Sequence, residues 1–289
     1  MKNLFKKASS GAVTPLSVAE KALKEWGVQY EKQPDGSLLA PGDLDISNQG
    51  LTSLPDLRQV KVGGAFNCSD NKLTSLEHVP QSVGGDFHCD HNHLTSLEHA
   101  PHTVIGSFWC SNNQLISLEY APHIVGEDFH CDHNHLTSLE HSPQSVGGGF
   151  YCDHNQLTSL EHAPQSIDGD FYCSDNKLTS LEHAPPFVGC SFYCHSNQLT
   201  SLEHAPQCIT GSFWCYSNQL TSLEHAPQTS RDLWSDFRKY SRWKQVPEDL
   251  RISPETKARR EAAIQQAATV LEAPLRIGGT LKFKSRGPA

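Results

Sequence analysis

The chain has 289 residues, of which 37% are hydrophobic, and a net charge of −9 with histidine counted as neutral. The charge is uneven, because residues 1–43 carry +1, residues 44–228 carry −16 and residues 229–289 carry +6. An acidic middle segment repels phosphate backbones, which argues against nucleic-acid binding by that segment. No stretch approaches the ~18 apolar residues of a membrane span, so we expect no membrane insertion.

The N-terminal segment, residues 1–43, is predicted to contain a capping helix over residues 15–26 (PLSVAEKALKEW). Thr14 can cap its first turn, Pro15 suits the first helical position and Gly27 suits the end. We expect this helix to cover the end of the segment that follows it. The first residues hold lysines without a continuous apolar region, so no secretory signal peptide is expected.

Residues 44–228 consist of copies of one phrase, Phe-x-Cys-x-x-Asn-x-Leu, at a fixed interval of 21 residues. The phenylalanines of this phrase are Phe66, Phe87, Phe108, Phe129, Phe150, Phe171, Phe192 and Phe213. The cysteines are Cys68, Cys89, Cys110, Cys131, Cys152, Cys173, Cys194 and Cys215. Upstream, Leu44 and Ile46 fit the same two positions, which gives about nine coils.

A period of 20–29 residues with an Asn near each strand end predicts a leucine-rich-repeat solenoid. Strand alternation places Phe and Cys inside and the residue between them outside. We therefore expect a parallel β-sheet on the concave face, extended and turn segments on the convex side, and α-helical caps at both ends. The Asn column is predicted to hydrogen-bond backbone groups freed at each turn.

The eight periodic cysteines are interpreted as small core hydrophobes, whereas Cys190 and Cys208 fall on turn or return positions. Coils ~4.8 Å apart fit poorly with disulfide geometry, so free thiols are expected. Free thiols favour a reducing, cytoplasmic location. Export into a host cell without a cleavable signal peptide is the alternative.

The segments FNCSDNKLTSLEHVP and FYCSDNKLTSLEHAP resemble the short leucine-rich repeats of bacteria and their phages. The segment PDGSLLAPGDLDISNQGLTSLP is similar to the first-coil cap of such arrays. The resemblance covers roughly residues 34–228 and implies a curved solenoid that binds other molecules. Some pathogen effectors join such arrays to a ubiquitin-ligase domain with a catalytic Cys, but here no Cys follows Cys215.

Residues 229–289 are predicted to form a C-terminal helical cap and a basic tail. Trp234, Phe237, Tyr240 and Trp243 form a stripe at steps of three that we interpret as the cap. A helix capped by Ser253 is expected from Pro254 to about residue 272, followed by a hairpin from Leu275. Residues 251–286 could contact nucleic acid or another acidic partner, including the chain's own solenoid.

The outward residues of the predicted sheet form a candidate protein-binding surface, because exposed aromatic side chains are frequent in binding hot spots. The residues between Phe and Cys include His88, Trp109, His130, Tyr151, Tyr172, Tyr193 and Trp214. The residues after Cys add Asp90, Asp132, Asp153, His195 and Tyr216. A purely structural aromatic ladder is the alternative interpretation.

Metal binding is weakly indicated by His88, Asp90, His130 and Asp132, which are legitimate ligand types. The two pairs lie two coils, about 10 Å, apart, so no metal site is predicted. No nucleophile with a base and an orienting group stands out, and no cofactor is predicted.

The sequence therefore predicts a protein-binding module that is not an enzyme. An effector delivered into another cell and an adaptor that contacts nucleic acid through its basic tail are the alternatives.

Overall fold

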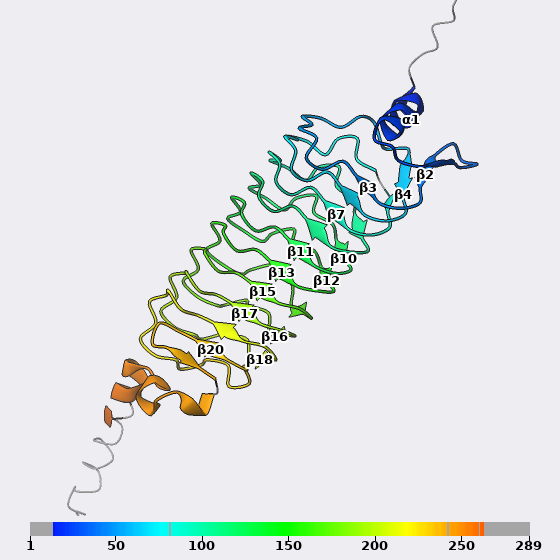
Figure 1. The fold of residues 1–289 in the computed structure, drawn as a ribbon. Coiled ribbons are helices and arrows are strands. Elements are labelled where there is room, and N and C mark those ends of the chain that lie inside the picture. The colour runs from blue at the N-terminus through cyan, green and yellow to red at the C-terminus, as the bar shows by residue number, and fades with distance from the viewer. Residues whose placement is uncertain (1–13, 81, 242, 260, 263–289) are drawn as a thin grey trace, which may run out of the picture.

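The computed structural model describes residues 14–80, 82–241, 243–259, 261 and 262. These residues wind into a stack of coils that advances along one direction, with helix α1 at the N-terminal end (Figure 1). The predicted tail hairpin and the later part of the predicted tail helix lie outside the described residues. Within the described part, no helix is long and apolar enough to cross a membrane.

The N-terminal cap forms as predicted. Helix α1 (Pro15–Glu25) begins with a capping box in which Thr14 and Ser17 exchange hydrogen bonds. It ends before Gly27, whose φ of +70° is the left-handed conformation that favours glycine. The helix buries Ala19 and Leu23 completely, so it closes the end of the core.

A long sheet of eleven strands runs the length of the stack, with one parallel strand from each coil and an antiparallel strand at its C-terminal edge. Its parallel strands are β3 (Leu44–Asp45), β5 (Phe66–Asn67), β7 (Phe87–His88), β9 (Phe108–Trp109), β11 (Phe129–His130), β13 (Phe150–Tyr151), β15 (Phe171–Tyr172), β17 (Phe192–Tyr193), β19 (Phe213–Trp214) and β20 (Leu233–Trp234). Equivalent residues of neighbouring coils pair directly, so each repeat position becomes a column.

The return side of the coils carries three short sheets that the sequence interpretation treated as extended chain. The first joins β1 (Glu31–Lys32), β2 (Leu38–Ala40), β4 (Val60–Val62) and β6 (Ser82–Val83). The other two contain β8 (Thr103–Val104), β10 (Ile124–Val125) and β12 (Ser145–Val146), then β14 (Ser166–Ile167), β16 (Phe187–Val188) and β18 (Cys208–Ile209). The Val residues of β4 to β12 and β16, together with Ile167 and Ile209, point into the core, whereas Ile124 of β10 is exposed.

The core is a set of parallel columns, as the repeat predicts. All eight periodic phenylalanines and all eight periodic cysteines have no exposed surface. Neighbouring phenyl rings from Phe66 to Phe213 lie 5.3–5.8 Å apart between centroids. All ten cysteines are free thiols, and Cys190 and Cys208 are the exposed ones.

Burial raises the pKa of a core thiol such as Cys152 well above its ordinary value.

The Asn column connects successive coils through side-chain hydrogen bonds. Asn155 is typical, because its Oδ1 accepts a hydrogen bond from the Leu136 N–H at 2.9 Å. Its Nδ2 donates to the carbonyl of Cys131 in the preceding coil at 3.0 Å and to that of Cys152 at 3.2 Å. A buried amide thereby satisfies backbone groups of two coils, which is the structural role that the sequence predicts.

Two positions of each of the eight coils that start at a core Phe adopt left-handed backbone conformations without glycine. The position two residues after Cys, as in His154, has φ of 49–54°, and the His of the Leu-Glu-His phrase, as in His162, has φ of 66–77°. Such angles are uncommon for residues with a side chain, although Asn, Asp and His adopt them more readily than most. The turns therefore dictate which way these side chains project from the stack.

The C-terminal cap contains the predicted aromatic stripe but is built mainly from strands and short 3-10 helices. Leu233 takes the place of the core Phe, so β20 continues the parallel sheet, and β21 (Lys239–Tyr240) pairs with it antiparallel. Two short 3-10 helices, η1 (Trp243–Gln245) and η2 (Glu248–Leu250), complete the cap. Tyr240 is buried as expected, whereas Phe237 is exposed.

A helix follows the cap from residue 254, and the described residues 254–259, 261 and 262 are helical. Ser253 is its N-cap, as predicted, because its hydroxyl accepts a hydrogen bond from the Thr256 N–H at 3.1 Å. The Glu224 carboxylate accepts hydrogen bonds from the Ser253 N–H at 2.8 Å and from the Thr256 hydroxyl at 3.0 Å. This contact fixes the start of the tail on the last repeat.

Candidate functional site

The most distinctive surface of the solenoid is a column of stacked rings on the outer face of the long sheet. We call this column the ring ladder, and it contains His88, Trp109, His130, Tyr151, Tyr172, Tyr193, Trp214 and Trp234. Centroid separations between successive rings range from 3.5 Å to 5.7 Å, and every ring is within 22° of parallel to the next. At one strand spacing per rung, the ladder extends over about 34 Å.

The stacking determines which parts of the rings a partner can reach. Each ring has its faces against its neighbours, so the side chains are half-buried, and His130 is only 8% exposed. The ring faces are therefore covered, the indole N–H groups of Trp214 and Trp234 are buried, and a partner can reach only the parts of the side chains that stay exposed. Burial raises the pKa of Tyr151 to about 12 and also raises that of Tyr172, so both hydroxyls are neutral hydrogen-bonding groups at ordinary pH.

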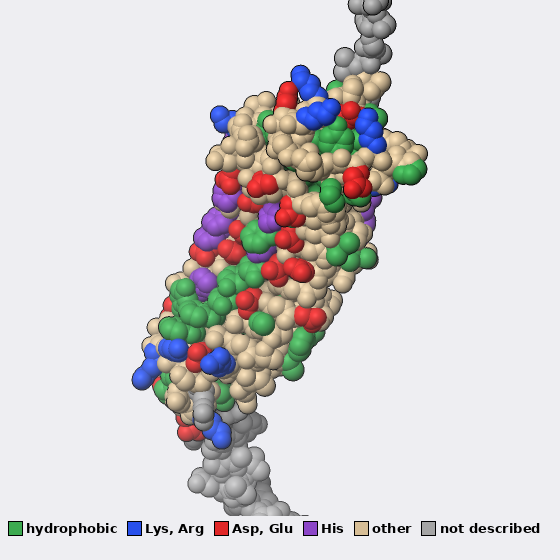
Figure 2. Space-filling model, turned by 45° about the vertical axis from the view of Figure 1, so that its right-hand side comes forward, with side chains coloured by type: hydrophobic (Ala, Val, Ile, Leu, Met, Phe, Trp, Pro, Cys, Tyr) green, Lys and Arg blue, Asp and Glu red, His purple; other side chains and the backbone are tan. Residues whose placement is uncertain are grey.

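Acidic side chains line one edge of the ladder. Asp86, Asp128 and Asp170 each use one carboxylate oxygen to accept a backbone N–H of the next coil at 2.6–2.7 Å. The second oxygen of Asp128 lies 3.9 Å from the His130 ring nitrogen, and that of Asp86 lies 3.8 Å from His88. Figure 2 shows hydrophobic, acidic and histidine side chains together on this part of the surface, with basic side chains gathered near the two ends of the stack.

A second column, formed by the residues that follow the core cysteines, lines the other edge. Asp132 accepts a hydrogen bond from the Ser111 hydroxyl, and its carboxylate lies 3.8 Å from His130. Burial acts to raise the pKa of Asp132, but the nearby His130 ring and the hydrogen bond from Ser111 outweigh it and hold the pKa below its ordinary value. Burial and the nearby charge of Asp132 raise the pKa of Asp153 to about 6. The His195 ring stacks on that of Tyr216, at 4.5 Å.

The candidate residues named from the sequence therefore fall into two adjacent columns on one face. The ring-ladder members lie at the centre, and Asp90, Asp132, Asp153, His195 and Tyr216 form the second column. Sequence reasoning missed Trp234, the last rung, whose indole stacks on that of Trp214 at 4.4 Å. The spacing there is 20 residues instead of 21 and the core Cys is replaced by Ser235, but the order Leu233, Trp234, Ser235 still follows the repeat pattern.

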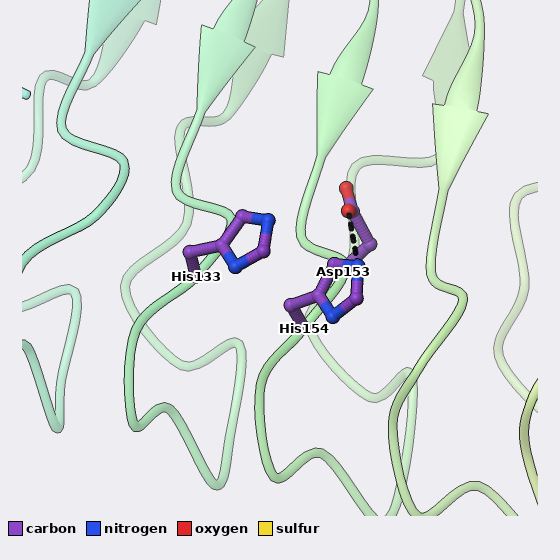
Figure 3. A group of neighbouring side chains, drawn as sticks. All are labelled: His133, Asp153 and His154. Carbon is purple, nitrogen blue, oxygen red and sulfur yellow. Dashed lines mark ion pairs between the residues drawn. The ribbon is translucent and has the colours of Figure 1, made fainter.

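The weak metal candidates do not converge. His88 Nδ1 lies 3.8 Å from Asp90 and His130 Nδ1 lies 3.8 Å from Asp132, and Trp109 separates the two pairs. Among the described residues, the group with converging ligand atoms is His133, Asp153 and His154, whose ligand atoms all lie within 4.8 Å of one another (Figure 3).

A second surface feature lies on the return side, between the Leu-Glu-His turns and strand β8. It is a hollow of about 630 Å³ lined by residues that include Arg58, Glu98, His99 and Tyr120. The coils from Phe87 to Asp128 also expose a group of hydrophobic side chains at positions where most other coils have polar or small ones, although Phe187 is likewise exposed at the repeat position of Ile124. The group consists of Ile105, Ile116, Tyr120 and Ile124. This hollow is the competing candidate for a binding surface.

Comparison with known proteins identifies similar folds. No protein-family model and no curated protein matches the sequence. YopM from Yersinia enterocolitica WA-314 is 25% identical, with a TM-score of 0.55 over 75% of this chain and 44% of YopM. YopM from Yersinia pestis, described as a leucine-rich effector protein, is 20% identical, with a TM-score of 0.40 over 75% of this chain and 74% of that one.

The chain spans less than half the length of the first of these two proteins. The repeat period, the parallel strands and this similarity agree on one conclusion: the protein is a leucine-rich-repeat solenoid of about nine coils.

Proposed function

We propose that the protein is a binding module that recognises a protein partner through the ring ladder and the acidic side chains beside it. The observation that carries the proposal is the continuous column of rings from Trp109 to Trp234, which no core requirement explains because the phenyl column already fills the interior. Tyr and Trp are enriched among the residues that dominate binding energy at protein interfaces.

The ladder is preorganised for binding. Because each ring is held between two neighbours, its rotamer is fixed before a partner arrives, and less conformational entropy is lost on association. Tyr172 and Tyr193 are an example, with centroids 3.9 Å apart and planes within 10°. A rigid row of hydroxyl groups and ring edges suits a partner whose backbone or polar side chains can donate and accept hydrogen bonds.

The charge beside the ladder indicates the chemistry of the partner. Asp86, Asp128 and Asp170 lie along one edge, and Asp90, Asp132 and Asp153 lie along the other. A surface with Lys or Arg side chains around a less polar centre would complement this arrangement and would be steered toward it. Nucleic acid would be repelled.

Two of the basic residues described near the C-terminus contact polar or aromatic groups of their own chain. Lys239 Nζ lies 4.3 Å from the centroid of the Trp234 ring and 3.4 Å from Asp232. Arg251 donates hydrogen bonds to the carbonyls of Val246 and Lys244, both at 2.9 Å. These contacts hold Lys239 and Arg251 on the C-terminal cap.

Affinity capture from the native cell with matched variants tests the proposal. In Tyr172→Ala/Tyr193→Ala two rungs are lost, whereas in Thr179→Ala/Thr200→Ala exposed side chains of the same two coils are changed away from the ladder. We expect the first variant to retain its circular dichroism spectrum and to bind a captured protein at least tenfold more weakly, while the second binds normally. Equal binding by both variants would contradict the proposal.

A third variant distinguishes the competing surface. Ile116→Thr/Tyr120→His restores the residues that the other coils carry at these positions. If this variant alone loses the captured protein, the return-side hollow is the binding surface and the ring ladder is structural.

A further inference from the structure

The turn that follows each core cysteine brings three ligand-type side chains together on two neighbouring coils. His133 belongs to the coil that starts at Phe129, and Asp153 and His154 belong to the next coil. Their ligand atoms all lie within 4.8 Å of one another, and His154 Nε2 is 3.9 Å from the Asp153 carboxylate (Figure 3). None of the three side chains contributes a rung to the ring ladder.

The left-handed turn explains why the two imidazoles meet. His133 and His154 occupy the same repeat position with φ of 51° and 49°, so their side chains leave the backbone in the same direction one coil apart. Their rings stack with centroids 4.1 Å apart. The preceding coil has Asn112 at this position, and the following coil has Asp175, whose carboxylate lies 3.7 Å from His154 Nε2.

The surrounding charge favours a cation. Asp153 has a side chain that is only 17% exposed, and the negative charge of Asp132 acts on it from the adjacent coil. Among the described residues, the ion-pair partner of Asp153 is a histidine, which has no charge unless it is protonated. A divalent ion would neutralise these carboxylates more completely than the neutral imidazole does.

The site also has room for an ion and for bound water. An open hollow of about 580 Å³ beside the turns is lined by residues that include His133, His154 and Asp175. His133 and His154 are exposed, so their rings can rotate toward a common point at the cost of their mutual stacking. Small rotations are sufficient because the ligand atoms already lie within 4.8 Å of one another, and ligand bonds to zinc are about 2.0–2.2 Å long.

We propose that His133, Asp153 and His154 bind one divalent transition-metal ion, with Asp175 as a fourth ligand. Two imidazole nitrogens with two carboxylate oxygens suit Zn²⁺ and its neighbours in the first transition row. Mg²⁺ and Ca²⁺ prefer sites made entirely of oxygen ligands, so they should bind poorly.

Isothermal titration of the metal-free, untagged protein with Zn²⁺ at pH 7.5 tests the proposal. The decisive pair of variants is His133→Ala/His154→Ala and His141→Ala/His162→Ala. The second pair is a close control, because it removes two exposed histidines from the same two coils, also at left-handed positions. We expect one tight site per chain, a loss of affinity of tenfold or more in the first variant, and unchanged affinity in the second.

Asp153→Asn supplies a further test that leaves the side-chain shape nearly intact. It should weaken Zn²⁺ binding several-fold while the thermal unfolding of the metal-free protein shows that the fold is kept. Binding should also weaken as the pH falls and the imidazoles become protonated. Equal Zn²⁺ affinity in both double variants, or a tight site that survives Asp153→Asn unchanged, would overturn the proposal.

Discussion

The indole of Trp234 stacks on that of Trp214, with centroids 4.4 Å apart and planes within 6°. This contact joins the last regular coil to a segment that no longer follows the 21-residue interval. Lys239 then covers the Trp234 ring with its ammonium group, 4.3 Å from the centroid. The ring ladder therefore ends in a cation–π contact that protects its last ring and gives the C-terminal end of the surface a different charge.

Replacement of Asn155 by Ala should lower the free energy of unfolding by about 1–3 kcal/mol, because backbone groups of two coils lose their buried partners. The Leu136 N–H loses its acceptor, and the carbonyl of Cys131 loses a donor. Chemical denaturation measures the change. Thr158→Ala, an exposed position in the same coil, is the control and should change little. An Asn155→Ala variant as stable as the wild type would show that the hydrogen bonds of Asn155 between neighbouring coils do not stabilise the fold.

Two of the ten thiols should react quickly with a thiol reagent in the folded protein. Cys190 and Cys208 are exposed, whereas the eight periodic cysteines are buried and burial raises the pKa of thiols such as Cys131. The thiolate is the reactive form, so both accessibility and pKa protect the core. Mass spectrometry after brief labelling at pH 8 should find the label on these two residues, with all ten labelled in denaturant. Rapid labelling of the periodic cysteines without denaturant would show that they do not lie in the core and would contradict the arrangement of the coils.

A β-branched residue at a left-handed turn position should destabilise the solenoid although the side chain is exposed. His162 has φ of 68°, a conformation that costs most residues roughly 1–2 kcal/mol and Gly almost nothing. His162→Val should therefore lower the free energy of unfolding by about 1–2 kcal/mol, and His162→Gly should leave it nearly unchanged. Thr158→Val introduces the same side chain where φ is not positive and should have little effect, as thermal denaturation would show.

The contact between Glu224 and the tail helix should weaken in acid. Burial acts to raise the pKa of Glu224, but the hydrogen bonds from Ser253 and Thr256 outweigh it and hold the pKa below its ordinary value. A carboxyl whose pKa is lower in the folded state stabilises the fold above its ordinary pKa, and this stabilisation is lost as the pH falls through the folded pKa. Hydrogen exchange should show protection of residues 253–259 at pH 6 that declines below about pH 4.

Glu224→Gln is the matched control for this pH dependence, because it keeps an acceptor but cannot titrate. Its hydrogen-exchange protection over residues 253–259 should be lower at pH 6 and should change little with acid. If wild type and variant lose protection in parallel as the pH falls, another group is responsible for the effect.

The regular part of the fold could be predicted because each repeat position has one physical role. Phe and Cys alternate with an outward residue, and copying at a fixed interval places equivalent residues on neighbouring strands, so the core and most rungs of the ladder follow from the sequence. Trp234 was missed because one residue is deleted before it and Ser235 replaces the core Cys. The C-terminal cap was expected to be helical because aromatic spacing alone does not distinguish a helix from a hairpin that continues the sheet.

The His133, Asp153 and His154 group depends on geometry that a residue pattern does not reveal. Strand alternation applies to residues 129–131, but the turn after Cys131 adopts φ of 51° at His133, and this angle decides the direction of the side chain. In other coils the same repeat position holds residues such as Asn112 or Ser196. The two histidines at this position therefore did not stand out in the sequence as metal ligands.

Site-specific photo-crosslinking on the ring ladder tests the central claim most directly. A photoreactive phenylalanine derivative at position 172, on the outer edge of the ladder, should form a crosslink to the bound protein partner after irradiation in the native cell. The same group at position 179, on an exposed turn of the same coil, should form none. Crosslinks from position 179 but not from position 172 would show that the partner occupies another face and would contradict the account.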